Sequence, residues 1–228
     1  APNSLSIDTS TGAVSGSPTN DDVGAHTITV TLTDLAGASA SDTFVLTVVN
    51  TNDAPVVSSP IADASTDEDA AFSATASFAD VDVGDVLTYS MSGAPSSLSI
   101  NPSSGAISGA PTNDDVGVHT ITLTATDVAG ASASDSFDLT VVNTNDAPVV
   151  SSPIADASTD EDAAFSATAS FADVDVGDVL TYSMSGAPST LSINPSTGAI
   201  SGTPLNADVG VHTITVTAAD DGTGTMSA

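Results

Sequence analysis

The chain has 228 residues, with 29 acidic side chains and no lysine or arginine, so its formal charge is −29. Nucleic acid is close to excluded as a partner, because its recognition needs lysine and arginine against phosphate. An anionic membrane surface is disfavoured for the same reason, and no segment is apolar for long enough to insert into a bilayer. The acidic, lysine-free and threonine-rich composition favours an extracellular, secreted or cell-surface location.

One sequence is repeated along the chain at an interval of 93 residues. Residues 50–96 are identical to residues 143–189, and residues 1–49 align with residues 94–142. A period of this length fits a self-contained domain with its own core rather than a solenoid repeat. We therefore expect three domains: the C-terminal half of a repeat at 1–49, a complete repeat at 50–142, and a third at 143–228 without its last strand.

Short runs of alternating apolar and polar residues predict the strands of the complete repeat. Turn sequences such as NPSSGA and TNDDVG separate these runs, and no segment has a helical period. About seven short strands with regular turns predict an all-β chain of tandem Greek-key sandwiches of immunoglobulin-like type. In chain order, we expect the strands near 56–61, 71–78, 86–92, 97–101, 105–109, 117–126 and 133–142.

Four acidic clusters recur in register, and all of them fall at expected strand ends or in loops, which would gather at the poles of a sandwich. Calcium takes six to eight oxygen ligands from carboxylates, amides and carbonyls. Capping of turns by Asp and Asn is the alternative for any single cluster, but four clusters without a cationic side chain favour calcium. The clusters are STDEDA (67–69, 160–162), FADVDVGD (80–85, 173–178), the NDDVG or NADVG turn (21–22, 114–115, 208) and a strand-end aspartate (34, 127, 220).

The sequence NTNDAP occurs twice, at 50–55 and 143–148, directly after the last predicted strand of a repeat. Its amide and carboxylate oxygens suit a hard cation. Proline fixes φ and lacks an N–H, so it starts the next repeat in an extended path. We interpret this segment as a joint that a bound metal makes rigid.

The motif series STDEDA, FADVDVGDVLTYSM, LSINPSSGAISGAPTNDDVGVHTITLTATD and FDLTVVNTNDAP resembles a cadherin repeat. It is most similar to the cadherin-like and dystroglycan-type cadherin-like (putative immunoglobulin) modules of large bacterial surface adhesins, over essentially the whole chain. The resemblance implies Ca²⁺ between consecutive repeats. For the second junction it implies the ligands Glu68, Asp115, Asn143, Asn145, Asp146, Asp173, Asp175 and Asp220. For the first it implies Asp22, Asn50, Asn52, Asp53, Asp80, Asp82 and Asp127.

Two departures from the cadherin pattern leave alternatives open. The linker opens with Asn rather than Asp and is one residue shorter before proline, and the turn reads Asn-x-Asp in place of Asp-x-Glu. Weaker affinity or one fewer ion per junction would follow. Calcium bound within each D-x-D-x-G-D loop is a further alternative.

The sequence predicts no enzyme. His26, His119 and His212 occur once per repeat at the start of a strand and on its core-facing side, where a structural role is expected, and no G-x-S-x-G elbow is present. The favoured function is a calcium-rigidified spacer in an extracellular adhesin or surface filament. The alternative is a calcium-dependent carbohydrate-binding or homophilic adhesion module. The expected partners are neighbouring repeats of the same chain, with like chains in a filament or surface glycans as further candidates.

Overall fold

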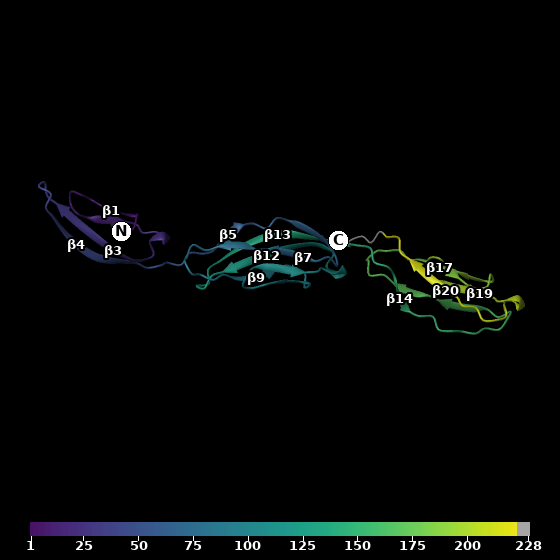
Figure 1. Cartoon of the computed structure of the whole chain (residues 1–228). Coiled ribbons are helices and arrows are strands. Elements are labelled where there is room, and N and C mark those ends of the chain that lie inside the picture. Colours follow the sequence, from purple (N-terminus) through teal and green to yellow (C-terminus); the bar gives the residue numbers. More distant parts are fainter. Residues whose placement is uncertain (223–228) are drawn as a thin grey trace.

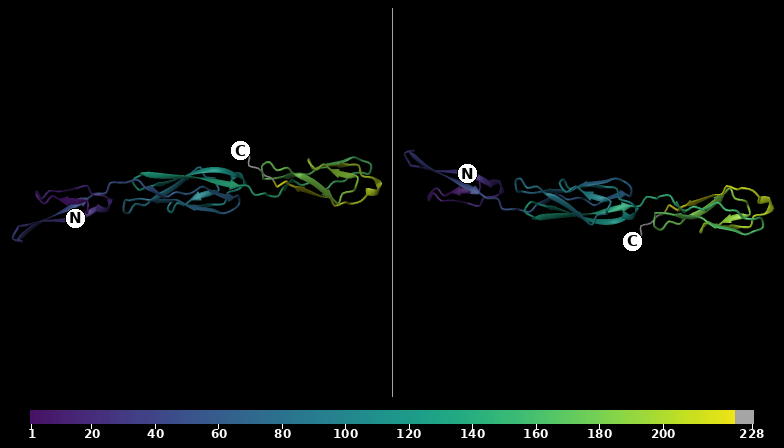
Figure 2. Two further views of the ribbon diagram at one scale, coloured as in Figure 1. Left: turned by 90° about the horizontal axis from the view of Figure 1, so that it is seen from above. Right: turned by 90° about the horizontal axis from the view of Figure 1, so that it is seen from below.

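The computed structural model describes residues 1–222 and consists of three β-sandwich bodies in a row (Figure 1). Views from above and below show that the bodies follow one another along one long axis and are joined by linkers (Figure 2). We call them the first module (β1–β4), the second module (β5–β13) and the third module (β14–β20). The prediction of an all-β chain of tandem immunoglobulin-like sandwiches is confirmed. The domain boundaries at residues 50 and 143 stay a prediction.

Two main sheets and one short strand pair form the second module. The larger sheet has the strand order β6 (Ala64–Asp67), β13 (Ser132–Val142), β12 (Gly117–Thr126) and β9 (Thr88–Ser92). The second sheet has the order β10 (Leu98–Ile100), β11 (Ala106–Gly109) and β7 (Phe72–Thr75), while β5 (Val56–Ser59) pairs with β8 (Ser77–Ala79). The pairing of β6 with β13 is parallel, and the other pairings are antiparallel.

The core of the second module comes from the inward faces of these strands. Successive side chains of a strand point to opposite faces, so Ile121 and Leu123 are buried while Thr122 and Thr124 remain partly exposed. Residues from β7, β10, β11 and β13 complete the same core cluster. Phe78 and Tyr89 add an edge-to-face ring pair with centroids 6.0 Å apart, a geometry that aromatic rings prefer.

The structure corrects two expectations about the strands. The predicted strand 71–78 is two strands in different sheets: β7 pairs with β11, and β8 pairs with β5. The Ala76 N–H, between them, donates to the carbonyl of Gly105 at 3.1 Å and extends the β7–β11 register by one residue. Strand β6 was not expected, although Ala64 and Thr66 do alternate with exposed residues. It forms through its parallel pairing with β13.

The other modules use subsets of the same plan. The first module contains β1 (Leu5–Ile7), β2 (Val14–Gly16), β3 (Gly24–Thr33) and β4 (Ser39–Val48). The third contains β14 (Val149–Ser152), β15 (Phe165–Thr168), β16 (Ser170–Ala172), β17 (Thr181–Ser185), β18 (Leu191–Ile193), β19 (Ala199–Gly202) and β20 (Thr215–Ala219). The residues that would follow β20 in the pattern of the second module lie beyond 222, outside the described residues. A 3-10 turn precedes β3, β12 and β20: η1 (Asn20–Asp22), η2 (Asn113–Asp115) and η3 (Asn206–Asp208).

Within the described residues, no helix has the length and apolar character needed to cross a membrane.

Candidate metal sites at the module junctions

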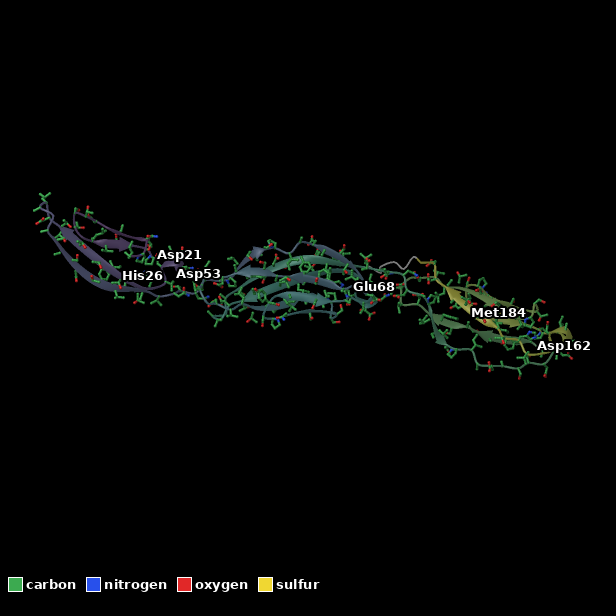
Figure 3. The ribbon with its side chains drawn as sticks, in the orientation of Figure 1. Asp21, His26, Asp53, Glu68, Asp162 and Met184 are labelled. Atoms are coloured by element: carbon green, nitrogen blue, oxygen red, sulfur yellow. The ribbon has the colours of Figure 1, made fainter. Side chains whose placement is uncertain are left out.

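The acidic motifs lie at the poles where the modules meet. Asp53 lies at the joint between the first and second modules, and Glu68 lies at the end of the second module that faces the third (Figure 3). Asp162, in the second copy of the Glu68 motif, lies at the far end of the third module (Figure 3). The repeat therefore brings one copy of the motif to a junction and leaves the other away from it.

Each linker is hydrogen-bonded to the module that follows it. In the second joint the Asp146 N–H donates to Asp175 Oδ2 at 2.6 Å, and the Asn145 side chain donates to Asp220 Oδ1 at 3.3 Å. The first joint repeats this pattern, from Asp53 N–H to Asp82 Oδ2 at 2.7 Å and from Asn52 to Asp127 Oδ2 at 2.9 Å. Hydrogen bonds thus hold each linker against the loop aspartate and the strand-end aspartate of the next module.

Glu68 connects the second module to the same linker. Its N–H donates to the Val142 carbonyl at 3.0 Å, which continues the β6–β13 ladder by one residue. Its Oε1 accepts the Thr144 N–H at 2.7 Å. The side chain is 3% exposed, and Oε2 is buried without a hydrogen-bond partner. One oxygen of this carboxylate is therefore fixed by the linker, and the other is available to a cation.

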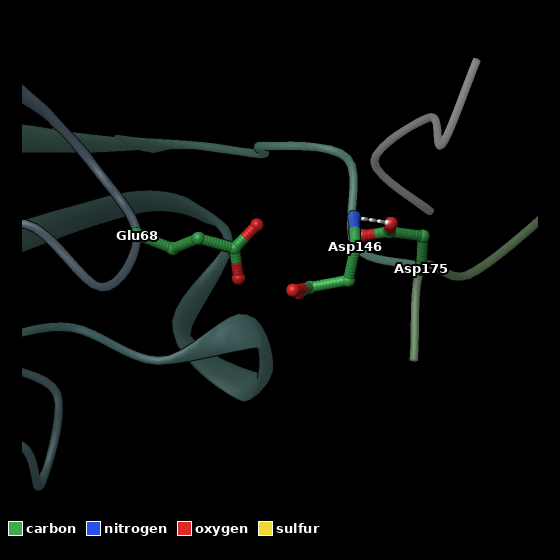
Figure 4. A group of neighbouring side chains, drawn as sticks. All are labelled: Glu68, Asp146 and Asp175. Atoms are coloured by element: carbon green, nitrogen blue, oxygen red, sulfur yellow. Dashed lines mark hydrogen bonds between the residues drawn. The ribbon is translucent and has the colours of Figure 1, made fainter. Parts of the chain in front are cut away.

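Three carboxylates from three segments meet at the second junction. Glu68 of the second module, Asp146 of the linker and Asp175 of the third module offer oxygens that all lie within 4.8 Å of one another. Figure 4 shows the side chains of Glu68 and Asp146 pointing toward each other, with Asp175 beside the linker backbone. No lysine or arginine exists to balance this group.

Two further acidic groups lie within single modules. Asp80, Asp85 and Asp127 form one in the second module, with oxygens within 4.8 Å of one another. In the third module Asp173, Asp175 and Asp178 form the other. These groups match the open alternative of a cation held in the D-x-D-x-G-D loop. Asp175 belongs to both the junction group and the loop group.

Asp85 and Asp178 were not among the predicted ligands, although the spacing of the loop had singled them out. Burial raises the pKa of Asp85, and the charges of Asp80, Asp82 and Asp127 raise it further. Burial also raises the pKa of Asp178, with Asp221 the largest charge contribution. Crowded carboxylates repel one another, and a bound cation would supply the positive charge that lowers their pKa values.

The unsatisfied oxygens test whether calcium fits these residues. Buried polar atoms are normally hydrogen-bonded, and a buried carboxylate without compensation is costly. Within residues 1–222, the buried side-chain oxygens without a partner are Ser97 Oγ and carboxylate oxygens of acidic residues: Glu68 Oε2, Asp80 Oδ2, Asp82 Oδ1, Asp85 Oδ2, Asp173 Oδ2 and both carboxylate oxygens of Asp178. The carboxylates all belong to the predicted acidic motifs, and their oxygens are hard ligands of the kind that calcium binds. The donor set fits calcium.

Some predicted ligands have other partners. Asp22 Oδ2 accepts the Ser4 hydroxyl at 2.6 Å, which with other hydrogen bonds lowers the pKa of Asp22. Asp115 Oδ2 accepts the N–H of Thr112 at 2.9 Å and so caps the turn η2. Among residues 1–222, neither carboxylate joins an acidic group close enough for a shared ion. Their role as ligands stays a prediction.

The amides that open the two linkers differ in their surroundings. Asn143 is half buried, and its side chain hydrogen-bonds Asp175, which helps to lower the pKa of that carboxyl against the opposing effect of burial. Asn50, its counterpart in the first joint, is exposed.

The three histidines repeat one backbone contact. His26 Nε2 lies 2.6 Å from the Asp22 carbonyl oxygen, His119 Nε2 lies 2.7 Å from that of Asp115, and His212 Nε2 lies 2.8 Å from that of Asp208. His26 and His119 are half buried, whereas His212 is exposed, contrary to the expectation of a core-facing ring.

Comparison with known proteins places the fold and the family. The crystal structure of repeats EC22–24 of mouse cadherin-23 superposes with a TM-score of 0.54 at 22% identity, covering 97% of this chain and 78% of that chain. This likeness shows the fold alone. An endo-fucoidan hydrolase of glycoside hydrolase family 107 matches 97% of this chain and 36% of its own at 26% identity, but its TM-score of 0.40 carries no argument.

Sequence similarity extends to a surface protein. Over 136 residues, or 60% of this chain, the sequence is 35% identical to the serine-rich adhesin for platelets of Staphylococcus aureus strain MRSA252. The aligned part covers 10% of that adhesin, and 6% of the one from strain MSSA476, so the chain spans a small part of these relatives. The model of the family described as "Putative Ig domain" matches residues 1–49, 54–142 and 147–228. The chain therefore belongs to this family and contains its domain in tandem copies.

Proposed function

We propose that the chain is a spacer segment of an extracellular bacterial surface adhesin, and that Ca²⁺ at the module junctions makes the spacer rigid. The observation that carries this proposal is the acidic group of Glu68, Asp146 and Asp175. It draws one carboxylate from each of two modules and one from the linker between them. A cation bound there ties three segments that are otherwise held together by a few hydrogen bonds.

The residues of the chain prepare this site without the metal. The parallel β6–β13 pairing brings Glu68 to the pole, and the Thr144 N–H fixes one of its oxygens. The Asp146 N–H holds Asp175 against the linker. Bound calcium supplies the positive charge that offsets the repulsion between these carboxylates. Ionised ligands are required, so binding is expected to weaken on acidification.

Three observations support an adhesin spacer over a catalyst or a receptor site. The modules lie in a row with their junctions on the long axis (Figure 1). The relative from Staphylococcus aureus is named an adhesin. The module copies are nearly identical in sequence, which suits a spacer that only has to extend the chain. The proposed partners are the neighbouring repeats of the same long chain, and the proposed location is the cell surface.

Small-angle scattering of the chain in calcium and in chelator tests the proposal, with circular dichroism recorded on the same samples. We expect the scattering profile to change on chelation, as the joints at 50–55 and 143–148 become flexible, while the β-sheet signal is kept. Metal analysis of the purified chain should find bound calcium. An unchanged profile together with absent calcium would show that the acidic motifs are turns. Calcium-dependent binding to a glycan array would instead favour a carbohydrate-binding module.

A further inference from the structure

The side-chain amide of Asn113 lies between two carboxylates of the second junction. Asn113 opens the turn η2 and is half buried. Its Nδ2 lies 3.3 Å from Asp146 Oδ2 and 3.2 Å from Asp175 Oδ1. An amide nitrogen carries two protons and no charge, so this one group donates to both carboxylates. It thereby links the second module, the linker and the third module.

The same amide recurs 93 residues earlier. Asn20 opens the turn η1 of the first module, and its Nδ2 donates to Asp53 Oδ2 at 2.7 Å. Asp53 is the counterpart of Asp146 in the first linker. The third copy, Asn206, is exposed. The contact between this amide and a linker carboxylate is therefore found at both junctions of the described chain. The sequence alone does not predict this contact, because an Asn at the start of a turn resembles an ordinary cap.

We propose that Asn113 stands in for the junctional cation of the second joint when calcium is absent, and that Asn20 holds the corresponding linker carboxylate of the first joint. This inference rests on the proposed calcium site. Asp146 and Asp175, which Asn113 bridges, are two of the three carboxylates in the junction group, so the amide and a cation compete for the same carboxylates.

The amide replaces the cation only in part, because it is neutral. It hydrogen-bonds two carboxylates but does not cancel their charge, and Glu68 Oε2 stays without a partner. The amide thus keeps the calcium-free joint close to its assembled geometry without filling the site. On binding, calcium takes over the contacts, and the amide is no longer needed to hold the joint. Asn113 is by this argument a positioning residue for the calcium-free state.

Amide hydrogen exchange of the whole chain distinguishes this role from others. The Asp146 N–H, bonded to Asp175, reports on the second joint, and the Asp53 N–H reports on the first. For Asn113→Ala we expect exchange at Asp146 to become on the order of tenfold faster in chelator, given the usual strength of hydrogen bonds to charged groups. In saturating calcium the rate should not change.

Matched variants give the controls. Asn206→Ala replaces the exposed copy and should leave both joints unaffected, and Asn20→Ala should accelerate exchange at Asp53 but not at Asp146. Asn113→Asp keeps the size of the side chain and exchanges a donor for a further negative charge. It should accelerate exchange at Asp146 in chelator more than Asn113→Ala does.

The outcomes separate three cases. Acceleration confined to chelator supports the proposal. Equal acceleration in chelator and in calcium would show that Asn113 has the same structural role in both states, and would overturn the proposal. An absence of acceleration in chelator would overturn it as well. If calcium does not slow exchange at Asp146 in the unaltered chain, the calcium site itself is wrong, and that result is visible without any variant.

Discussion

The second and third modules share 47 consecutive identical residues, 50–96 and 143–189, and yet differ in structure. Residues Ala64–Asp67 form β6 in the second module, whereas residues 157–160, of the same sequence, form no strand. Glu68 is 3% exposed, and its copy Glu161 is exposed. The partner of β6 is β13, and the described part of the third module has no counterpart of β13. A distant partner, rather than the local sequence, therefore decides whether this segment is a strand.

The local turn persists without that partner. Asp69 and Asp162 both have a left-handed backbone, with φ of 57° and 59°. Their N–H groups donate to Pro111 and Pro204 carbonyls at 2.7 and 2.8 Å. The third module also carries an open groove of about 1150 Å³, lined by Ile154, Phe165 and Ile200 among others. Their copies in the second module pack in its core. The turn at Asp69 and Asp162 is therefore held by contacts that do not involve β13, whereas burial of the acidic ligand does depend on β13.

The largest expected effect comes from weakening β13. Leu139 is fully buried in the core, and Leu139→Ala should lower the free energy of unfolding of the second module by about 2–5 kcal/mol. The segment 64–67 should then resemble 157–160, with fast amide exchange. Denaturant unfolding and hydrogen exchange measure both effects. Ser136→Ala, on the exposed face of the same strand, is the control, and equal losses for the two variants would contradict this account.

Glu68→Gln and Glu161→Gln compare one residue in its two settings. Removing the charge at the buried junction copy should weaken calcium binding there by on the order of tenfold, since ligand charge sets calcium affinity. The same change at the exposed copy should leave calcium binding at both described junctions unchanged. Calorimetric titration decides, and a similar loss for both variants would exclude Glu68 as a specific ligand.

A proline in each copy of the β6 sequence sharpens the comparison. The Glu68 N–H points to β13, and N–H groups alternate in direction along a strand, so the Thr66 N–H points there too. Thr66→Pro removes this donor and should cost about 0.5–1.5 kcal/mol of second-module stability, with faster exchange at Glu68. Thr159→Pro lies in the unpaired copy and should cost nothing measurable. A clear stability loss in the third module would show that 157–160 is paired in solution.

The smallest difference between the second and third modules is expected for a substitution in a turn that has the same structure in both. Gly105 and Gly198 have φ of 68° and 65°, and an added Cβ would touch Tyr89 or Tyr182. Alanine at either position should destabilise its module by roughly 1–2 kcal/mol, the cost of a left-handed backbone. Exchange of the Tyr89 and Tyr182 amides, which donate to Pro102 and Pro195, follows each module separately. Unequal effects would show that the partner strand also influences this turn.

These contrasts explain what the sequence could predict. Alternation of apolar residues predicted β12 and β13 at nearly their observed bounds, because that pattern is local. It missed β6, whose strand state depends on residues about 75 positions away. It merged β7 and β8 because alternation does not show that the two halves of the run pair with different strands, β11 and β5.

The candidate site was predictable in outline from its acidic motifs. The grouping was not, because the distances between Glu68, Asp146 and Asp175 depend on how two modules and a linker meet. Asn113 opens the Asn-x-Asp turn that stands in place of Asp-x-Glu, but the sequence does not show that its amide bridges two carboxylates across the junction.

The parallel pairing of β6 and β13 has a mechanical consequence. The chain enters the second module before β5 and leaves it after β13, so tension along the long axis pulls the start of β6 and the end of β13 in opposite directions. Because the two strands are parallel, that force slides one strand along the other and loads the hydrogen bonds of the ladder together rather than one after another. Glu68, at the end of β6, continues this ladder directly into the linker through Val142 and Thr144. A pull on the chain would therefore load the β6–β13 ladder and the junction residues at the same moment.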